Sequence, residues 1–138
     1  MAFIYSQKVL FRHCDPAAIV FYPRYFEMMN DVVEEFFDTV LGFSFNQMHK
    51  KNGIPTVQME TKFVAPSRLG DVLKIELDCV KIGHTSLSFN YKAVCETQLR
   101  FTAHSTVVFV DSNGKPTPWP DGLRQKLENQ IEGNFGVK

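Results

Sequence analysis

An aspartate followed by proline stands directly before a short apolar run that leads into a long helix. The segment reads Asp15-Pro16-Ala17-Ala18-Ile19-Val20-Phe21-Tyr22-Pro23. A helix N-terminus presents unpaired backbone N–H groups and partial positive charge, which can hold a developing oxyanion. A carboxylate beside it can act as a base or a nucleophile. Carbonyl chemistry is therefore the leading hypothesis for this segment.

Backbone chemistry assigns the roles within the segment. Pro23 suits the first helical position but has no N–H, so the donor must come from Tyr22 or from the turn at residues 18–21. Asp15 precedes a proline, which biases its backbone toward an extended conformation at the end of a strand. The alternative interpretation is that Asp15 only caps a turn, as many Asp-Pro pairs do.

The helix that positions this segment is predicted from hydrophobic spacing. Apolar residues recur at intervals of three and four from residue 23 to about residue 41, and Gly42 follows where a left-handed terminal residue is expected. The apolar positions are Tyr25, Phe26, Met28, Met29, Val32, Val33, Phe36, Phe37, Val40 and Leu41. One wide stripe of this helix is therefore expected to be buried.

Five segments rich in β-branched and aromatic residues predict strands at residues 3–12, 55–65, 71–81, 85–96 and 101–111. Short turn-forming links favour antiparallel pairing, and residues 121–131 predict a terminal helix. The expected class is α+β, with the sheet curled around the helix. Such a sheet has open edges, so we expect a homodimer.

Composition limits the remaining possibilities. The 138 residues are 44% hydrophobic, which favours one domain over residues 1–138. Zero formal net charge without a run of like charge argues against nucleic acid and membrane partners. No apolar run approaches about 20 residues, so we expect a cytoplasmic protein. The three cysteines lack metal-ligand spacing, so neither a disulfide nor a metal site is expected.

The motifs resemble those of hotdog-fold acyl-CoA thioesterases of the 4-hydroxybenzoyl-CoA thioesterase type. The resemblance rests first on Asp15-Pro16-Ala17, on residues 19–23 and on Tyr25-Phe26. It continues over nearly the whole chain, through Phe63, Pro66, Gly70 and Asp71, then Gly83-His84-Thr85-Ser86, and finally Gly114 and Pro116. It implies a five-stranded antiparallel sheet around a central helix, homodimers often paired into tetramers, and active sites at the protomer boundary. No cofactor is implied.

The resemblance also implies roles for individual residues. Asp15 matches the catalytic carboxylate, and the backbone N–H of Tyr22 matches the group that polarises the thioester carbonyl. Apolar walls from Ile19 and Phe21 are expected to hold an aromatic or short- to medium-chain acyl group. The expected substrate-binding turn contributes Lys81, His84, Thr85 and Ser86, and the candidate phosphate partners are Lys81, His84, Arg68 and Arg100.

Two positions depart from the family pattern. Ala18 stands where the family commonly has glycine, and the turn at residues 81–86 lacks the clustered basic residues of the aromatic-substrate enzyme. His13 could assist Asp15, although a partly exposed strand histidine is the favoured interpretation.

Other functions remain open from the residues alone. Asp15 could be a general base or a nucleophile, and the acyl carrier could be coenzyme A or a carrier protein. A hotdog dehydratase or hydratase would need a histidine paired with an acid across the site, which the Asp-Pro loop does not supply. A noncatalytic acyl-binding module is the third possibility.

Overall fold

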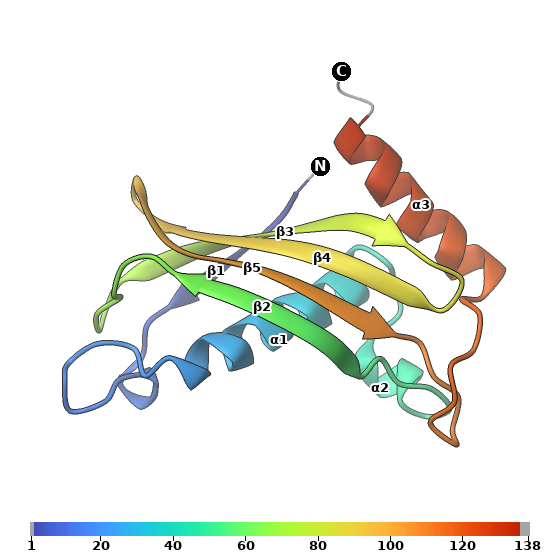
Figure 1. Ribbon diagram of the computed structural model, residues 1–138, viewed down its shortest axis with the longest axis horizontal. Coiled ribbons are helices and arrows are strands. Elements are labelled where there is room, and N and C mark those ends of the chain that lie inside the picture. The colour runs from blue at the N-terminus through green and yellow to red at the C-terminus, as the bar shows by residue number, and fades with distance from the viewer. Residues whose placement is uncertain (1, 136–138) are drawn as a thin grey trace.

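The computed structural model describes residues 2–135, with side chains described up to residue 131 (Figure 1). Its elements, in chain order, are β1 (Phe3–Lys8), the 3-10 turn η1 (Phe11–His13), α1 (Pro23–Thr39), α2 (Phe45–Met48), β2 (Thr56–Phe63), β3 (Val72–Ile82), β4 (Ser86–Cys95), β5 (Gln98–Val108) and α3 (Asp121–Phe135).

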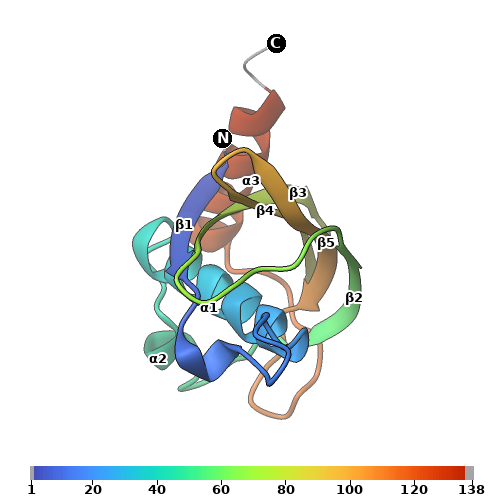
Figure 2. The same ribbon diagram turned by 90° about the vertical axis from the view of Figure 1, so that its left-hand side faces the viewer.

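The strands form one antiparallel sheet that curls over α1. Its order is β1-β3-β4-β5-β2, so β1 and β2 are the edges. Figure 2, which views the molecule nearly along α1, shows the strands as an arc with the helix on its concave side. The predicted α+β class, a long helix wrapped by five antiparallel strands, is confirmed.

Aromatic packing joins α1 to the sheet. Phe36 is 2% exposed, and its ring lies 5.7 Å from the ring of Phe3 on β1 and 6.1 Å from that of Phe89 on β4. Burying one such side chain contributes about 1.5–3 kcal/mol to folding. The buried face of α1 consists of Tyr25, Met28, Met29, Val32, Val33, Phe36 and Phe37. The sheet therefore covers the predicted stripe except at Val40, which follows the last residue of α1 and is 36% exposed.

The terminal helix α3 lies beside the half of β3 that β1 does not reach. Strand β1 pairs only with residues 72–77 of β3. From α3, Lys126 Nζ donates to the carbonyl of Leu41 at 2.9 Å, and Arg124 Nη1 donates to that of Gly83 at 2.9 Å. Of the two edge strands, β2 has eight residues and β1 has six, so β2 offers the longer edge.

Most predicted boundaries shift by a few residues, and two strand boundaries and one missed helix have a clear physical reason. The first strand ends at Lys8, because residues 11–13 turn back so that the N–H of Leu10 donates to Nδ1 of His13. The last strand begins at Gln98, because Glu96 adopts a φ of +57° and closes a shorter turn than expected. The connecting segment after α1 contains the short helix α2, which the sequence did not predict.

None of the helices in the described part of the chain combines the length and apolarity needed to cross a membrane. Within residues 2–135, no group of three or more His, Cys, Asp or Glu side chains is placed to hold a metal ion.

The Phe36→Ala variant tests the aromatic joint between α1 and the sheet. It should lower the free energy of unfolding by about 3–5 kcal/mol, because a buried ring is removed from a packed core. Urea denaturation measures this change. Phe11→Ala, at a ring that is 84% exposed, should change the stability little. Equal losses in both variants would contradict the packing described for Phe36.

Candidate functional site

Asp15 begins a small hairpin that leads into α1. Cys14 and Val20 form an antiparallel bridge, and the N–H of Asp15 donates to the carbonyl of Ile19 at 3.1 Å. The N–H of Ala18 returns to the carbonyl of Asp15 at 2.9 Å. Residues 16–18 therefore form a three-residue hairpin loop of the kind that ends in a left-handed residue.

The Asp15 carboxylate also closes this turn. Its Oδ1 accepts the N–H of Ala17 at 2.8 Å, which is the turn-capping role considered from the sequence. Within residues 2–135, Oδ2 has no hydrogen-bond donor. The side chain is partly exposed. One carboxylate oxygen is thus held in place, and the other is open to a ligand.

Ala18 has a φ of +67°, the left-handed conformation in which glycine is favoured. This is the position where the sequence departs from the glycine common in the resembling family. The backbone keeps the glycine-like shape despite the added Cβ, so the hairpin carries local strain at Ala18.

The backbone donors around the helix start divide into bonded and open groups. The N–H groups of Ala18, Val20 and Phe21 donate to the carbonyls of Asp15, Ser67 and His13. The N–H groups of Ile19 and Tyr22 have no acceptor in the described part of the chain. Tyr22 is the residue before Pro23, the first residue of α1, so its open N–H lies at the positive end of that helix.

A cavity of about 280 Å³ lies beside Tyr22. The Phe63 ring lies 5.8 Å from the ring of Tyr22 and is stacked at 5.8 Å on that of Tyr25. The full lining is Ile19, Val20, Tyr22, Tyr25, Phe63, Val64, Ala65 and Pro66. The predicted residues Ile19 and Tyr22 therefore come together at one apolar cavity, and Asp15 lies just outside it on the adjoining hairpin.

Phe21 does not line this cavity. Its side chain is 44% exposed, and its ring packs edge-on against the Tyr22 ring at 5.7 Å. A larger cavity of about 790 Å³ lies further along α1, between α1, α2 and β2, and includes Phe26. The rings of Phe26 and Phe63 meet edge to face at 6.3 Å, so this aromatic pair separates the two cavities.

The predicted substrate-binding turn lies at the opposite end of the sheet from Asp15 (Figure 1). Strand β3 starts beside Val9, six residues before Asp15. It has eleven residues, so its far end is about 33 Å from its first residue. There Lys81 and His84 are exposed, and the carbonyl of Thr85 accepts the N–H of Phe109. The carbonyl of Ser86 accepts Nε1 of Trp119 at 3.0 Å. Within one protomer these four residues are therefore not joined to the Asp15 hairpin.

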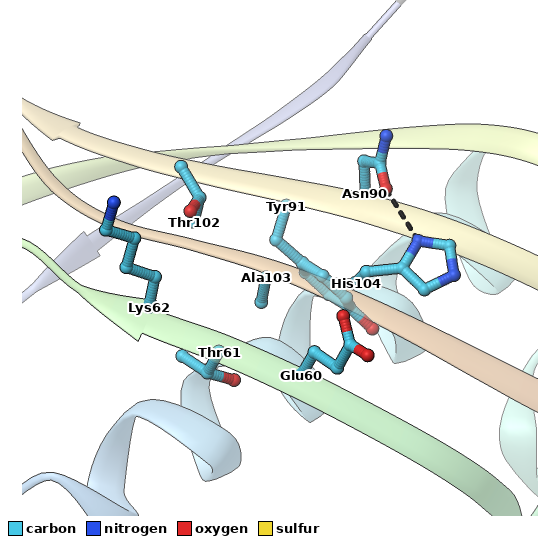
Figure 3. A pocket seen from close by; sticks show the side chains of 8 residues that line it. All are labelled: Glu60, Thr61, Lys62, Asn90, Tyr91, Thr102, Ala103 and His104. Atoms are coloured by element: carbon cyan, nitrogen blue, oxygen red, sulfur yellow. Dashed lines mark hydrogen bonds between the residues drawn. The ribbon is translucent and has the colours of Figure 1, made fainter.

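A polar hollow of about 500 Å³ lies on the outer side of the sheet, over β2, β4 and β5 (Figure 3). In this view Glu60, Asn90 and His104 point away from the helices, and His104 Nδ1 lies 2.7 Å from Asn90 Oδ1. The rest of the lining is Thr61, Lys62, Tyr91, Thr102 and Ala103. None of the residues expected to do chemistry lines this hollow.

His13 is buried, so the expectation of a partly exposed strand histidine was wrong. It is 3% exposed and ends the turn η1. Its Nδ1 accepts the N–H of Leu10 at 2.8 Å, which requires an unprotonated Nδ1. Burial, and secondly the nearby Arg12 charge, lower the His13 pKa. The unprotonated ring therefore closes the turn η1, and the backbone carbonyl of His13 separately ties this turn to the hairpin by accepting the N–H of Phe21 at 2.9 Å.

Arg100, one of the candidate phosphate partners, is also buried. It is 9% exposed, and its Nη1 lies 2.7 Å from Asp71 Oδ2. The backbone N–H of Arg68, and then the Arg100 guanidinium, hold the Asp71 pKa below its usual value. A guanidinium enclosed in this way does not reach a surface phosphate. Arg68 itself remains exposed.

The chain is similar to known proteins in sequence pattern and in fold. Residues 9–127 match the model of a family described as the thioesterase-like superfamily. None of the curated proteins matches the chain in sequence.

Solved structures are similar along almost the whole chain. A gentisyl-coenzyme A thioesterase is 26% identical, with 91% of this chain and 99% of that one covered and a TM-score of 0.83. A 1,4-dihydroxy-2-naphthoyl-CoA thioesterase from Synechocystis is 19% identical, with 94% and 97% covered and a TM-score of 0.86. A protein from Staphylococcus aureus in complex with CoA is 17% identical, with 96% and 85% covered and a TM-score of 0.88. The last two similarities concern the fold alone.

Ala18→Gly tests the strain in the Asp15 hairpin. Glycine removes a left-handed alanine but increases the entropy of the unfolded chain, so we expect a net gain of about 0.5–1 kcal/mol in the free energy of unfolding. Ala17→Gly, at a residue without positive φ, should instead lose about 0.5–1 kcal/mol. Urea denaturation of both variants measures the difference. A destabilised Ala18→Gly would contradict the strain.

Proposed function

The chain belongs to the thioesterase-like superfamily, and on that premise we propose that it is an acyl-CoA thioesterase of the 4-hydroxybenzoyl-CoA thioesterase type. It hydrolyses an aromatic or short- to medium-chain acyl-CoA to the free acid and CoA. The observation that carries this proposal is the open backbone N–H of Tyr22 at the start of α1, next to the hairpin that holds Asp15.

Thioester hydrolysis places negative charge on the carbonyl oxygen as the nucleophile adds. The N–H of Tyr22 is fixed before reaction by the helix that follows it, and the helix dipole favours that charge. One such donor contributes about 3 kcal/mol to lowering the barrier. Collapse of the tetrahedral intermediate then expels the CoA thiolate, which takes up a proton, and leaves the acid.

Asp15 supplies the other half of the reaction. Ala17 holds one carboxylate oxygen, and the open Oδ2 either removes a proton from the attacking water or attacks the carbonyl carbon to form a mixed anhydride that water hydrolyses. Both routes consume one water and give the same products. The turn-capping bond and the catalytic role are compatible, because they use different oxygens.

The acyl group occupies the cavity beside Tyr22. Its volume of about 280 Å³ lies just below the range of about 300–1,000 Å³ that is typical of ligand pockets. Its aromatic walls, Tyr22, Tyr25 and Phe63, offer flat surfaces to a ring. The gentisyl-CoA thioesterase among the similar structures acts on an aromatic acyl-CoA by its name, which supports the same class here.

A homodimer joined through β2 completes the site. An antiparallel pair of β2 strands extends the sheet and covers the open edge. Two-fold symmetry then brings the partner's turn at residues 81–86 to the Asp15 end of this protomer. Lys81, His84, Thr85 and Ser86 would contact the CoA portion from the partner, and the dimers would pair again into tetramers.

Asp15→Asn tests the catalytic carboxylate. Because the amide is a poor base and nucleophile, kcat for release of CoA thiol should fall about a hundredfold or more, with KM little changed. A thiol-reactive dye and a panel of aromatic, short-chain and long-chain acyl-CoAs measure this. Asp38→Asn, an exposed carboxylate at the other end of α1, is the matched control.

Two outcomes of that panel and one labelling experiment are informative. Full activity of Asp15→Asn would remove Asp15 from the mechanism, and no release by the unaltered protein from any substrate would favour an acyl-binding module. Oxygen-18 from labelled water in the Asp15 carboxylate after a single turnover would identify the anhydride route.

Mixing two defective variants tests the shared site. Asp15→Asn lacks the acid, and Lys81→Ala/His84→Ala lacks the proposed CoA contacts. After the subunits exchange, random pairing gives mixed dimers with one intact site each, so about a quarter of the unaltered activity should return at low substrate. Sedimentation measures the assembly. No recovery in exchanged dimers would contradict a site shared between protomers.

A further inference from the structure

We propose that Arg100 is a positioning residue, which acts through the connection between β2 and β3 to hold the Asp15 hairpin in its reactive shape. This rests on the proposed function. It concerns a group that is buried away from the substrate and touches no reacting atom, unlike Asp15 and Tyr22.

A β-bulge turns Arg100 toward this connection. Ala93 pairs with Phe101 and Val94 with Leu99, so Arg100 is the extra residue of β5 between two consecutive pairs. A bulge re-aims the side chain of its extra residue. The carbonyl of Arg100 also accepts the N–H groups of Val64 and Ala65, at 2.8 and 3.2 Å, which fixes the bulge to the start of the connection.

The buried Arg100 guanidinium contacts three residues of this connection. Nη1 lies 3.1 Å from the carbonyl of Pro66, 3.1 Å from Oγ of Ser67 and 2.7 Å from Oδ2 of Asp71. Asp71 Oδ2 also accepts the N–H of Arg68 at 2.9 Å. One cation therefore holds both ends of the turn at residues 66–71.

The turn at residues 66–71 is bonded to the Asp15 hairpin. The carbonyl of Ser67 accepts the N–H of Val20 at 2.8 Å, and Arg68 bridges to Ile19. The carbonyl of Asp71 accepts the N–H of Val9 at 2.7 Å, just before the turn η1. The turn that Arg100 organises is therefore bonded to the chain on both sides of Asp15.

A second contact connects the same turn to α1. Tyr25 is 4% exposed, and its phenol lies close to Ser67, the residue that Arg100 also contacts. Burial raises the Tyr25 pKa, so the phenol is neutral at neutral pH. Ser67 therefore links the Arg100 guanidinium, the Asp15 hairpin and the first turn of α1.

One nitrogen of the Arg100 guanidinium makes all three side-chain contacts with the turn, because Nη1 is the atom near Pro66, Ser67 and Asp71. The ammonium of a lysine also carries its donors on a single nitrogen, so a lysine at this position is expected to keep part of these contacts. Arg100 meets two oxygens of the turn besides the carboxylate, and its buried Nε has no partner among the described residues. Removal of the cation would leave the Asp71 carboxylate without its charged partner and free the turn to move.

Arg100→Met, Arg100→Lys and the control Lys126→Met test the proposal. Displacing the acid by about 1 Å costs about a hundredfold in rate. We expect kcat of Arg100→Met to fall by about 10–100-fold with KM within about threefold, and Arg100→Lys to recover part of the loss. Lys126 also donates to a backbone carbonyl, but at the far end of α1, so Lys126→Met should keep kcat.

Hydrogen exchange of the free protein provides a readout that needs no substrate. Amides of residues 14–22, including that of Val20, should exchange faster in Arg100→Met and partly recover in Arg100→Lys, while Lys126→Met leaves them unchanged. Circular dichroism confirms folding, and Arg100→Lys serves if Arg100→Met does not fold.

The outcomes separate the two proposals. Unchanged exchange at residues 14–22, or a kcat within about twofold of the unaltered protein, would overturn the positioning role. If the unaltered protein releases no thiol, the proposed function fails, and the exchange result alone still decides whether Arg100 holds the hairpin.

Discussion

Burial of one face of α1 under the curled sheet is the constraint on which the rest of the structure depends. The rings of Phe36 and its neighbours fix the helix against β1 and β4, and this packing determines where the helix begins. The open N–H of Tyr22 takes its direction from the start of the helix, because no side chain caps the helix there. The precision of the candidate site is therefore inherited from the core.

The same dependence explains which parts of the molecule could be predicted from sequence. Spacings of three and four identified the buried face of α1, and alternation with turn residues identified the five strands, because both signals follow from local geometry. The turn-capping role of Asp15, an alternative interpretation of the sequence, was also open to prediction, since an Asp-Pro pair is a local turn signal. The departure at Ala18 from a family glycine pointed to the residue that has a φ of +67°.

Features that depend on distant parts of the chain could not be predicted. The strand pattern placed Arg100 outside the expected last strand and left it as a candidate surface cation, because a bulge is not visible in alternation alone. His13 was expected on a strand, but the structure places it in the turn η1, because the N–H of Leu10 donates to its ring there. The turn at residues 81–86 matched a family motif, but only its place in the sheet shows that it lies far from Asp15 within one protomer.

The pairing of β1 has a consequence for how the chain is made. Phe3 on β1 pairs with Leu77 on β3, so the first strand leaves the ribosome long before its neighbour is synthesised. During that interval the aromatic side of α1 has no sheet to cover it, and non-local pairing of this kind is slow. The nascent chain therefore passes through a stage with exposed apolar surface, when chaperone binding and aggregation compete with completion of the fold.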